Sequence, residues 1–383
     1  MVLNKNKKNI KVDGNRLFFL EGIEALRGIA IILVIGFHSI LVLFPGYFFR
    51  NSDYSNKGIL LFKSIELDRL ILNFNPLGRG GCGVTLFLVI SGFLIHLIYL
   101  RSNKKKLNLK VFFQKRFWRI VPPYYIILLC FFLINEELNT TGLSNLISHV
   151  LFFHNLNDTT FFTINPSFWS IALEVQLYLL YPIFLLLRRC FSTNKILVFL
   201  IIFYILTSEL TIPSLGSSFA KDTFVLRTWF VWVSGAFLAE EYFNKRRLSN
   251  YPFRVFAMLF CIYLMLSIFN FGGAYGELKK LISTASFIFL IEFSLFNSPK
   301  NSLYKILFSF LKFIGLISYS LYLIHQPLLL ELIEILKPET SIQLLNTIIG
   351  YILTLSIVVV ISYVSYRFLE QKSIAFGKKI NYK

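Results

Sequence analysis

The chain has 383 residues, of which 56% are hydrophobic and only 15% are charged, and 43 of them are phenylalanine. A soluble domain carries about 25% charged residues, so this composition excludes an ordinary soluble enzyme and indicates a polytopic membrane protein. The net charge of +19 is compatible with a nucleic-acid partner by its size alone. The positions of the basic residues argue against that partner, as described below.

Long apolar runs recur along the whole chain, and ten of them are long enough to be considered as membrane helices. They cover residues 23–43, 81–100, 119–135, 169–187, 196–213, 227–240, 253–270, 281–296, 313–335 and 345–369. We therefore expect an all-α integral membrane protein, a bundle of about ten transmembrane helices. Its domain, 23–369, follows a basic cytoplasmic segment, 1–22, and precedes a cytoplasmic tail, 370–383, with no soluble domain expected.

The distribution of Lys and Arg predicts the orientation of this bundle. If the N-terminus is cytoplasmic, most of the 39 basic residues fall in inner segments or adjoining helix ends, and the outer loop 136–168 has none. This is the positive-inside pattern for ten spans with both termini in the cytoplasm. The basic inner loops then meet anionic membrane lipid, and no nucleic acid is needed to explain them. The other long outer loop, 44–80, is an exception with five basic residues.

Two patterns that are associated with cofactors or metals elsewhere do not predict such a site here. Residues 78–83 fit G-x-G-x-x-G, but a dinucleotide site requires a preceding strand and a βαβ unit, and here the motif leads into a membrane helix. The four cysteines are scattered and form neither a zinc nor a redox motif. We expect no metal site and no bound cofactor.

The first span contains Arg27 and His38, two ionisable residues in one apolar helix. An arginine near the bilayer centre costs roughly 2.5–3.5 kcal/mol, so such residues need a partner or a function. Eleven residues in a helix place them on one face, about 16 Å apart along the axis. A lone intramembrane histidine is often only a hydrogen-bond partner for a neighbouring helix, so a structural role for His38 remains an alternative.

Glu174, in the fourth span, is expected at the same depth as His38, close to the outer ends of their helices. A carboxylate beside an imidazole orients the ring and raises its basicity, which suits a general base. We therefore predict a pair between Glu174 and His38. The alternative is a structural polar network.

Arg116 and Arg119 open the third span from its cytoplasmic end and share one helix face. Together with Arg27 they would form a basic inner mouth, and arginine forks match phosphate geometry. Anchoring by the positive-inside rule explains the same two arginines without a ligand.

The ninth span carries Tyr319, Tyr322 and His325 at spacings of three residues, which forms a polar stripe on an apolar helix. Such a stripe lines a cavity or a buried interface. Ser91 and Gly92 in the second span permit two helices to approach closely.

Taken together, these motifs resemble the acyltransferase-3 family of membrane acyltransferases, which modify bacterial surface polysaccharides and related glycans, typically by O-acetylation. The resemblance runs from about Glu21 to Glu370. It rests on Arg27 and His38 with ten residues between them, on Gly83 through Leu94, on Arg116-x-x-Arg119, on Trp169 through Pro182, on Ser318 through Pro327, and on Glu370. Two departures are Thr85, where many members have an acidic residue, and Glu370-Gln371-Lys372, where members end in Glu-Arg/Lys-Pro.

The resemblance implies a ten-helix bundle in the bacterial cytoplasmic membrane and an essential histidine in the first span, here His38. It also implies an acyl-CoA co-substrate, usually acetyl-CoA, reached from the cytoplasm. Some members carry a further soluble hydrolase-like domain, which we do not expect here.

We predict transfer of an acyl group, in the first instance acetyl, from acyl-CoA to a sugar hydroxyl of a cell-surface or lipid-linked glycan. His38 is the predicted general base or transient acyl carrier, and Glu174 orients it. Three arginines hold the phosphates of the donor (Arg27, Arg116 and Arg119). Five residues are assigned to the substrate channel (Trp169, Tyr319, Tyr322, His325 and Ser91).

Two other function classes account for part of these features. A transporter or flippase for a glycan or lipid-linked sugar explains polar residues inside the membrane equally well, but it predicts no dependence on a thioester. A membrane glycosyltransferase is disfavoured because the distinctive residues lie within the spans rather than in large outer loops. A purely structural scaffold would not require a histidine and an arginine on the same face of the first helix.

Overall fold

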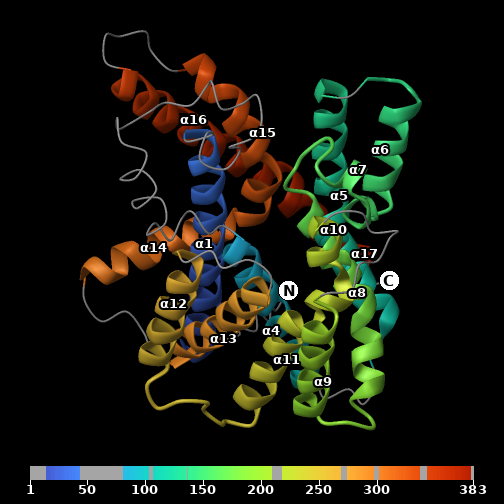
Figure 1. Ribbon diagram of the computed structural model, residues 1–383, viewed down its shortest axis with the longest axis vertical. Coiled ribbons are helices and arrows are strands. Elements are labelled where there is room, and N and C mark those ends of the chain that lie inside the picture. The colour runs from blue at the N-terminus through green and yellow to red at the C-terminus, as the bar shows by residue number, and fades with distance from the viewer. Residues whose placement is uncertain are drawn as a thin grey trace, which may run out of the picture.

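The computed structural model describes residues 14–43, 81–102, 107–135, 137–208, 218–268, 274–296, 302–336 and 343–380. Every regular element in these ranges is a helix, which confirms the predicted all-α class (Figure 1). The loop 44–80, predicted to be an outer loop and carrying five basic residues, lies outside the described residues, as do the first three residues of the glycine motif.

Five helical stretches are long and apolar enough to cross a membrane, and a sixth qualifies if a bent pair counts as one span. They are Glu21–Ser39, Gly81–Arg101, Leu109–Ile134, Trp169–Leu187 and Ile348–Ile380, with the bent pair Tyr304–Leu316 and Ser318–Ile333. The chain is therefore a multi-pass membrane protein. The full set of ten spans and the cytoplasmic position of both termini stay predictions.

The helices agree with the predicted apolar runs in order and, except at one place, in number. In chain order the long helices are α1 (Gly14–Leu43), α4 (Gly81–Arg101), α5 (Leu109–Asn135), α8 (Trp169–Leu187), α9 (Thr193–Leu206), α11 (Val225–Phe243), α12 (Pro252–Ile268), α13 (Ala274–Phe296), α14 (Ser302–Leu316), α15 (Ser318–Leu336) and α16 (Gln343–Ser365). A π-helical turn at Tyr366–Glu370 joins α16 to α17 (Gln371–Ile380), so the last helix continues beyond the predicted end at residue 369.

The exception is the predicted ninth span, 313–335, which is wrong as a single helix. It is divided into α14 and α15, whose axes differ by 76° across a break at Ile317. A close tertiary contact lies next to the break. A Cβ atom built on Gly315 would lie 1.7 Å from the carbonyl oxygen of Glu24, so the end of α14 presses directly on the backbone of α1. The apolar periodicity of the sequence runs through this point and does not reveal the turn.

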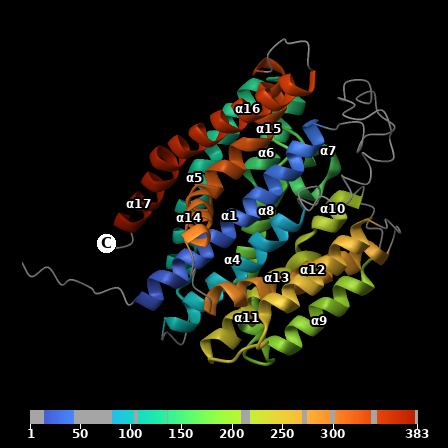
Figure 2. The same ribbon diagram turned by 90° about the vertical axis from the view of Figure 1, so that its left-hand side faces the viewer.

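Helix α1 lies inside the bundle and packs against α4, α13, α14 and α15. Figure 2 shows it running between α16 and α17 on one side and the group of α9, α11 and α12 on the other. Glycines allow the closest approaches: a Cβ on Gly28 would lie 2.1 Å from Leu311 O, and one on Gly92 would lie 1.9 Å from Trp232 O. The predicted packing role of Gly92 is thus confirmed, with α11 as the partner.

The segment between α5 and α8, predicted as a loop, is folded. It contains α6 (Thr140–Val150), a 3-10 turn (His154–Leu156) and α7 (Asp158–Phe161), and α10 (Ser218–Thr223) packs against it. His149 and His154 stack with ring centroids 3.8 Å apart, and both are fully buried. Burial lowers the pKa of His149 to about 4, so this ring is neutral at physiological pH.

Candidate active site

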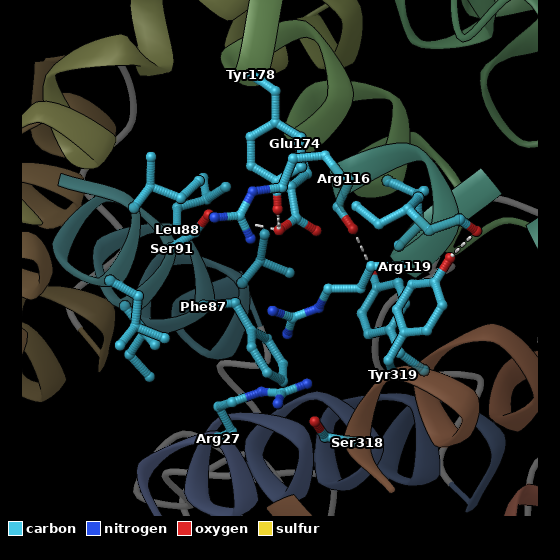
Figure 3. Close-up of a pocket in the computed structure, with 18 residues that line it drawn as sticks. Arg27, Phe87, Leu88, Ser91, Arg116, Arg119, Glu174, Tyr178, Ser318 and Tyr319 are labelled. Atoms are coloured by element: carbon cyan, nitrogen blue, oxygen red, sulfur yellow. Dashed lines mark hydrogen bonds between the residues drawn. The ribbon is translucent and has the colours of Figure 1, made fainter. Parts of the chain in front are cut away.

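A cavity lies inside the bundle where α1, α4, α5, α8 and α15 meet (Figure 3). One wall is apolar and includes Phe87 and Leu88 of α4. The other walls carry the polar and charged side chains that the sequence singled out. The five helices span residues 14 to 336 of the chain, so the cavity exists only in the folded bundle.

Three arginines line this cavity: Arg27 from α1, and Arg116 and Arg119 from α5. Figure 3 shows their guanidinium groups directed into the same space. None of the ion pairs formed within the described ranges involves them, since no carboxylate there approaches within 4.0 Å. The Nε atom of Arg116 is buried without a hydrogen-bond partner. The guanidinium of Arg116 instead lies over the rings of Tyr178 and Phe112, 5.5 and 5.7 Å from their centroids.

Glu174 of α8 lines the same cavity, where its Oε1 accepts hydrogen bonds from Tyr178, one turn later, and from Ser91 Oγ at 3.4 Å. It is close enough to all three arginines for electrostatic interaction, but beyond ion-pair distance. From the sequence, Tyr178 was part of the motif from Trp169 through Pro182 but was given no role in the site. Its i, i+4 spacing from Glu174 on one helix face is the signal that would have assigned it one.

The predicted pair between Glu174 and His38 is not formed, and this prediction is corrected. The depth argument placed the start of α8 level with the end of α1. Glu174 instead faces α4, where Ser91 donates a hydrogen bond to it, and it lines the cavity together with the three arginines.

His38 is paired instead with His325 of α15. The Nδ1 atom of His38 lies 2.9 Å from Nε2 of His325, and the ring centroids are 4.9 Å apart. His325 is fully buried, and its Nδ1 lies 2.9 Å from the carbonyl oxygen of Tyr322. Neither histidine lines the cavity itself, but the Tyr322 ring does, and its centroid lies 5.5 Å from that of His325.

The five residues predicted to line the channel fall into two groups. Ser91, Tyr319 and Tyr322 line the cavity. His325 lies behind Tyr322, and Trp169 stacks on Phe161 of α7 with ring centroids 5.9 Å apart. The tyrosine hydroxyls are held in place: Tyr319 donates to Ile120 O at 2.8 Å, and Tyr322 donates to Ser167 O at 3.0 Å while accepting from Ser170 Oγ at 2.6 Å.

Glu370, at the end of the motifs that carry the resemblance, is buried. It sits in the π-helical turn, is 4% exposed, and accepts a hydrogen bond from Ser320 Oγ of α15 at 3.1 Å. It also interacts electrostatically with Arg27 and Arg119 from outside the cavity lining. Within the ranges described above, no group of three or more metal-ligating side chains occurs. The absence of a metal site from the whole chain stays a prediction.

Comparisons with known proteins place the chain in a family. The model of the acyltransferase domain matches residues 20–367. The chain is 28% identical over 365 residues to the peptidoglycan O-acetyltransferase OatA of Listeria monocytogenes, an alignment that covers 84% of this chain and 56% of that protein. It is 26% identical over 350 residues to the O-acetyltransferase OatA of Staphylococcus aureus, covering 82% of this chain and 56% of that protein. The chain thus spans about half the length of these relatives. No solved structure matches it.

Proposed function

Because the chain belongs to the family of the acyltransferase domain, we propose that it transfers an acyl group, in the first instance acetyl, from acyl-CoA to a sugar hydroxyl of a cell-surface glycan. The family match confirms the resemblance that its motifs predicted. Both relatives are named as O-acetyltransferases and one as acting on peptidoglycan, so peptidoglycan is the first acceptor to test. A lipid-linked sugar is the second.

The observation that carries this proposal is the group of three arginines around one cavity without a carboxylate at ion-pair distance. Burying a charge without a counter-ion costs several kcal/mol, and proteins do not normally leave such groups unpaired. An anionic ligand that enters the cavity would remove this cost. Coenzyme A carries several phosphate oxyanions, for which the arginine fork has the matching geometry.

The position of His38 supports a route from this cavity to a reacting end. Arg27 and His38 lie on one helix, α1, eleven residues apart, or about 16 Å along its axis. Tyr322 lines the cavity and contacts His325, and His325 contacts His38. A donor whose phosphates bind the arginines would extend its pantetheine arm along this line and bring the thioester toward His38.

The reaction then requires two proton transfers, one to His38 and one from it. His38 removes the proton from the acceptor hydroxyl as that oxygen attacks the thioester carbonyl carbon. The C–S bond breaks, and the CoA thiolate takes the proton from the imidazolium. A transient acyl group on His38 would divide the same transfer into two steps, and it stays an alternative within the proposal.

We further propose that the protein lies in the bacterial cytoplasmic membrane with ten spans and both termini in the cytoplasm. The positive-inside distribution of Lys and Arg supports this orientation. It places the arginine end of α1 on the side where acyl-CoA is made. Cysteine labelling of single-cysteine variants from either side of inverted and intact vesicles tests the orientation.

The direct test uses the purified protein in liposomes with acetyl-CoA labelled in the acetyl group and peptidoglycan fragments as acceptor. We expect label on the glycan, and we expect no label with His38→Ala. Arg189→Ala is a matched control, because Arg189 is an exposed arginine at the end of α8, outside the cavity. Movement of the glycan across the membrane without any transfer of label would contradict the proposal and favour the transporter.

A further inference from the structure

The hydrogen bond between His38 and His325 has a direction that the surrounding backbone fixes. The Nδ1 atom of His325 lies 2.9 Å from the carbonyl oxygen of Tyr322. A carbonyl oxygen only accepts, so the hydrogen of this bond is on Nδ1 of His325. A neutral imidazole carries a single N–H, so the Nε2 atom of His325 has a lone pair and accepts.

The shared hydrogen between the two rings therefore belongs to His38. It is carried by Nδ1 of His38, which lies 2.9 Å from the accepting Nε2 of His325. The opposite assignment would require a doubly protonated His325. That cation would be fully buried, and none of the ion pairs formed within the described part of the chain would neutralise it.

With its hydrogen on Nδ1, the neutral ring of His38 keeps a lone pair on Nε2.

We infer that His325 is a positioning residue that fixes His38 in the tautomer whose Nε2 removes the proton from the acceptor hydroxyl. This inference rests on the proposed function for its catalytic meaning, but the tautomer of His38 is a property of the protein alone. His325 itself does not touch the substrate. It replaces the carboxylate that the sequence suggested for this task, and it does so without adding a charge inside the membrane.

Two substitutions separate this role from a structural one. In His325→Gln the side-chain amide reaches the position of Nε2, so its oxygen accepts the hydrogen of His38, while the bond to Tyr322 is lost. In His325→Asn the shorter amide reaches the position of Nδ1, so the bond to Tyr322 is kept and the one to His38 is lost. We expect His325→Asn to lower kcat by about 10²-fold with little change in the KM for acetyl-CoA, and His325→Gln to stay within roughly tenfold of the parent.

The second readout is independent of activity. In protein labelled with ¹⁵N-histidine, and with the signals of His38 identified by their loss in His38→Asn, we expect a protonated Nδ1 and an unprotonated Nε2 in the parent and in His325→Gln. In His325→Asn we expect a mixture of tautomers. An Nε2-protonated His38 in the parent overturns the inference, and so does equal activity of the two variants in an active parent. If the parent transfers no acetyl group, the proposed function fails and the spectra alone judge the inference.

Discussion

Two groups of arginines in this protein have opposite surroundings. Arg227 of α11 is 2% exposed, and its guanidinium lies 2.5 Å from Glu277 and 3.5 Å from Asp222. Arg188, at the end of α8, lies 2.7 Å from Glu240. The three cavity arginines, by contrast, have no carboxylate within 4.0 Å among the described residues. Arg227 and Arg188, which join helices, each have a carboxylate beside them, and the cavity arginines without one agree with the proposed anionic ligand.

The ion pairs of Arg227 and of Arg188 connect helices. Glu277 belongs to α13 and Asp222 to α10, so Arg227 ties α11 to both. Glu240 of α11 also contacts His96 Nε2 at 2.9 Å and accepts from Thr193 Oγ1 at 2.6 Å, which adds α4 and α9. None of the residues in these two sets of ion pairs lines the cavity.

The largest expected difference between the two groups is in stability. Arg227→Met leaves the partly buried Glu277 without its ion-pair partner, and we expect the free energy of unfolding to fall by about 3–5 kcal/mol. Arg116→Met breaks no ion pair and places an apolar chain against Tyr178 and Phe112, so we expect unchanged or increased stability. Unfolding of both variants in the same detergent measures this. Equal destabilisation by the two substitutions would remove the distinction between the groups.

The next effect is stabilisation by the ligand. Coenzyme A at about 100 times its Kd should stabilise the parent protein by about 2.7 kcal/mol. Pantetheine, which has no phosphates, should give far less at the same concentration. The melting temperature in detergent, measured with each compound, tests this. A shift with pantetheine as large as that with coenzyme A would show that the arginines do not bind phosphates.

A single cavity arginine should contribute less than the whole ligand. We expect Arg116→Ala to raise the KM for acetyl-CoA by about 10- to 100-fold, which corresponds to roughly 1.5–3 kcal/mol for one charge-assisted hydrogen bond. The KM for the acceptor should change much less. Steady-state kinetics with each substrate varied in turn separate the two, with Arg189→Ala as the control. Equal changes in both values would contradict a phosphate role.

The smallest effect is expected for Glu174→Gln. Glutamine keeps an oxygen for Tyr178 and Ser91 but removes a negative charge next to the donor. We expect the KM for acetyl-CoA to fall a few-fold. This corresponds to less than about 1 kcal/mol, the usual size of an interaction between charges that are not fully buried. A fall in kcat of about 10²-fold with an unchanged KM would instead support the predicted, and here corrected, role of Glu174 beside His38.

The sequence predicted the helices and the arginines well because both depend on local patterns. Long apolar runs predict helices, because in lipid a segment must form all its backbone hydrogen bonds internally. The spacing of Arg116 and Arg119, and their place at the start of a span, put them on one face near Arg27. The break at Ile317 was missed because the apolar pattern runs through it, and the contact beside it joins Gly315 to Glu24, more than 290 residues away in the chain.

The pairing of His38 was missed for a related reason. Hydropathy gives an approximate depth for each residue but does not tell which helices are neighbours. His325 and Glu174 were both polar residues in apolar helices, and only the packing of α15 against α1 selects His325. Tyr319 and Tyr322 were found because a polar stripe on one helix face is a local pattern.

The break between α14 and α15 also shapes the electric field of the cavity. The first two residues of α15, Ser318 and Tyr319, line the cavity, so this helix begins there. The first N–H groups of a helix have no partner within it, and they carry about half a positive charge together. Part of the attraction for an anion therefore belongs to the main chain and survives every side-chain substitution. Exchange of all three arginines would leave this main-chain contribution in place, opposed by the charge of Glu174.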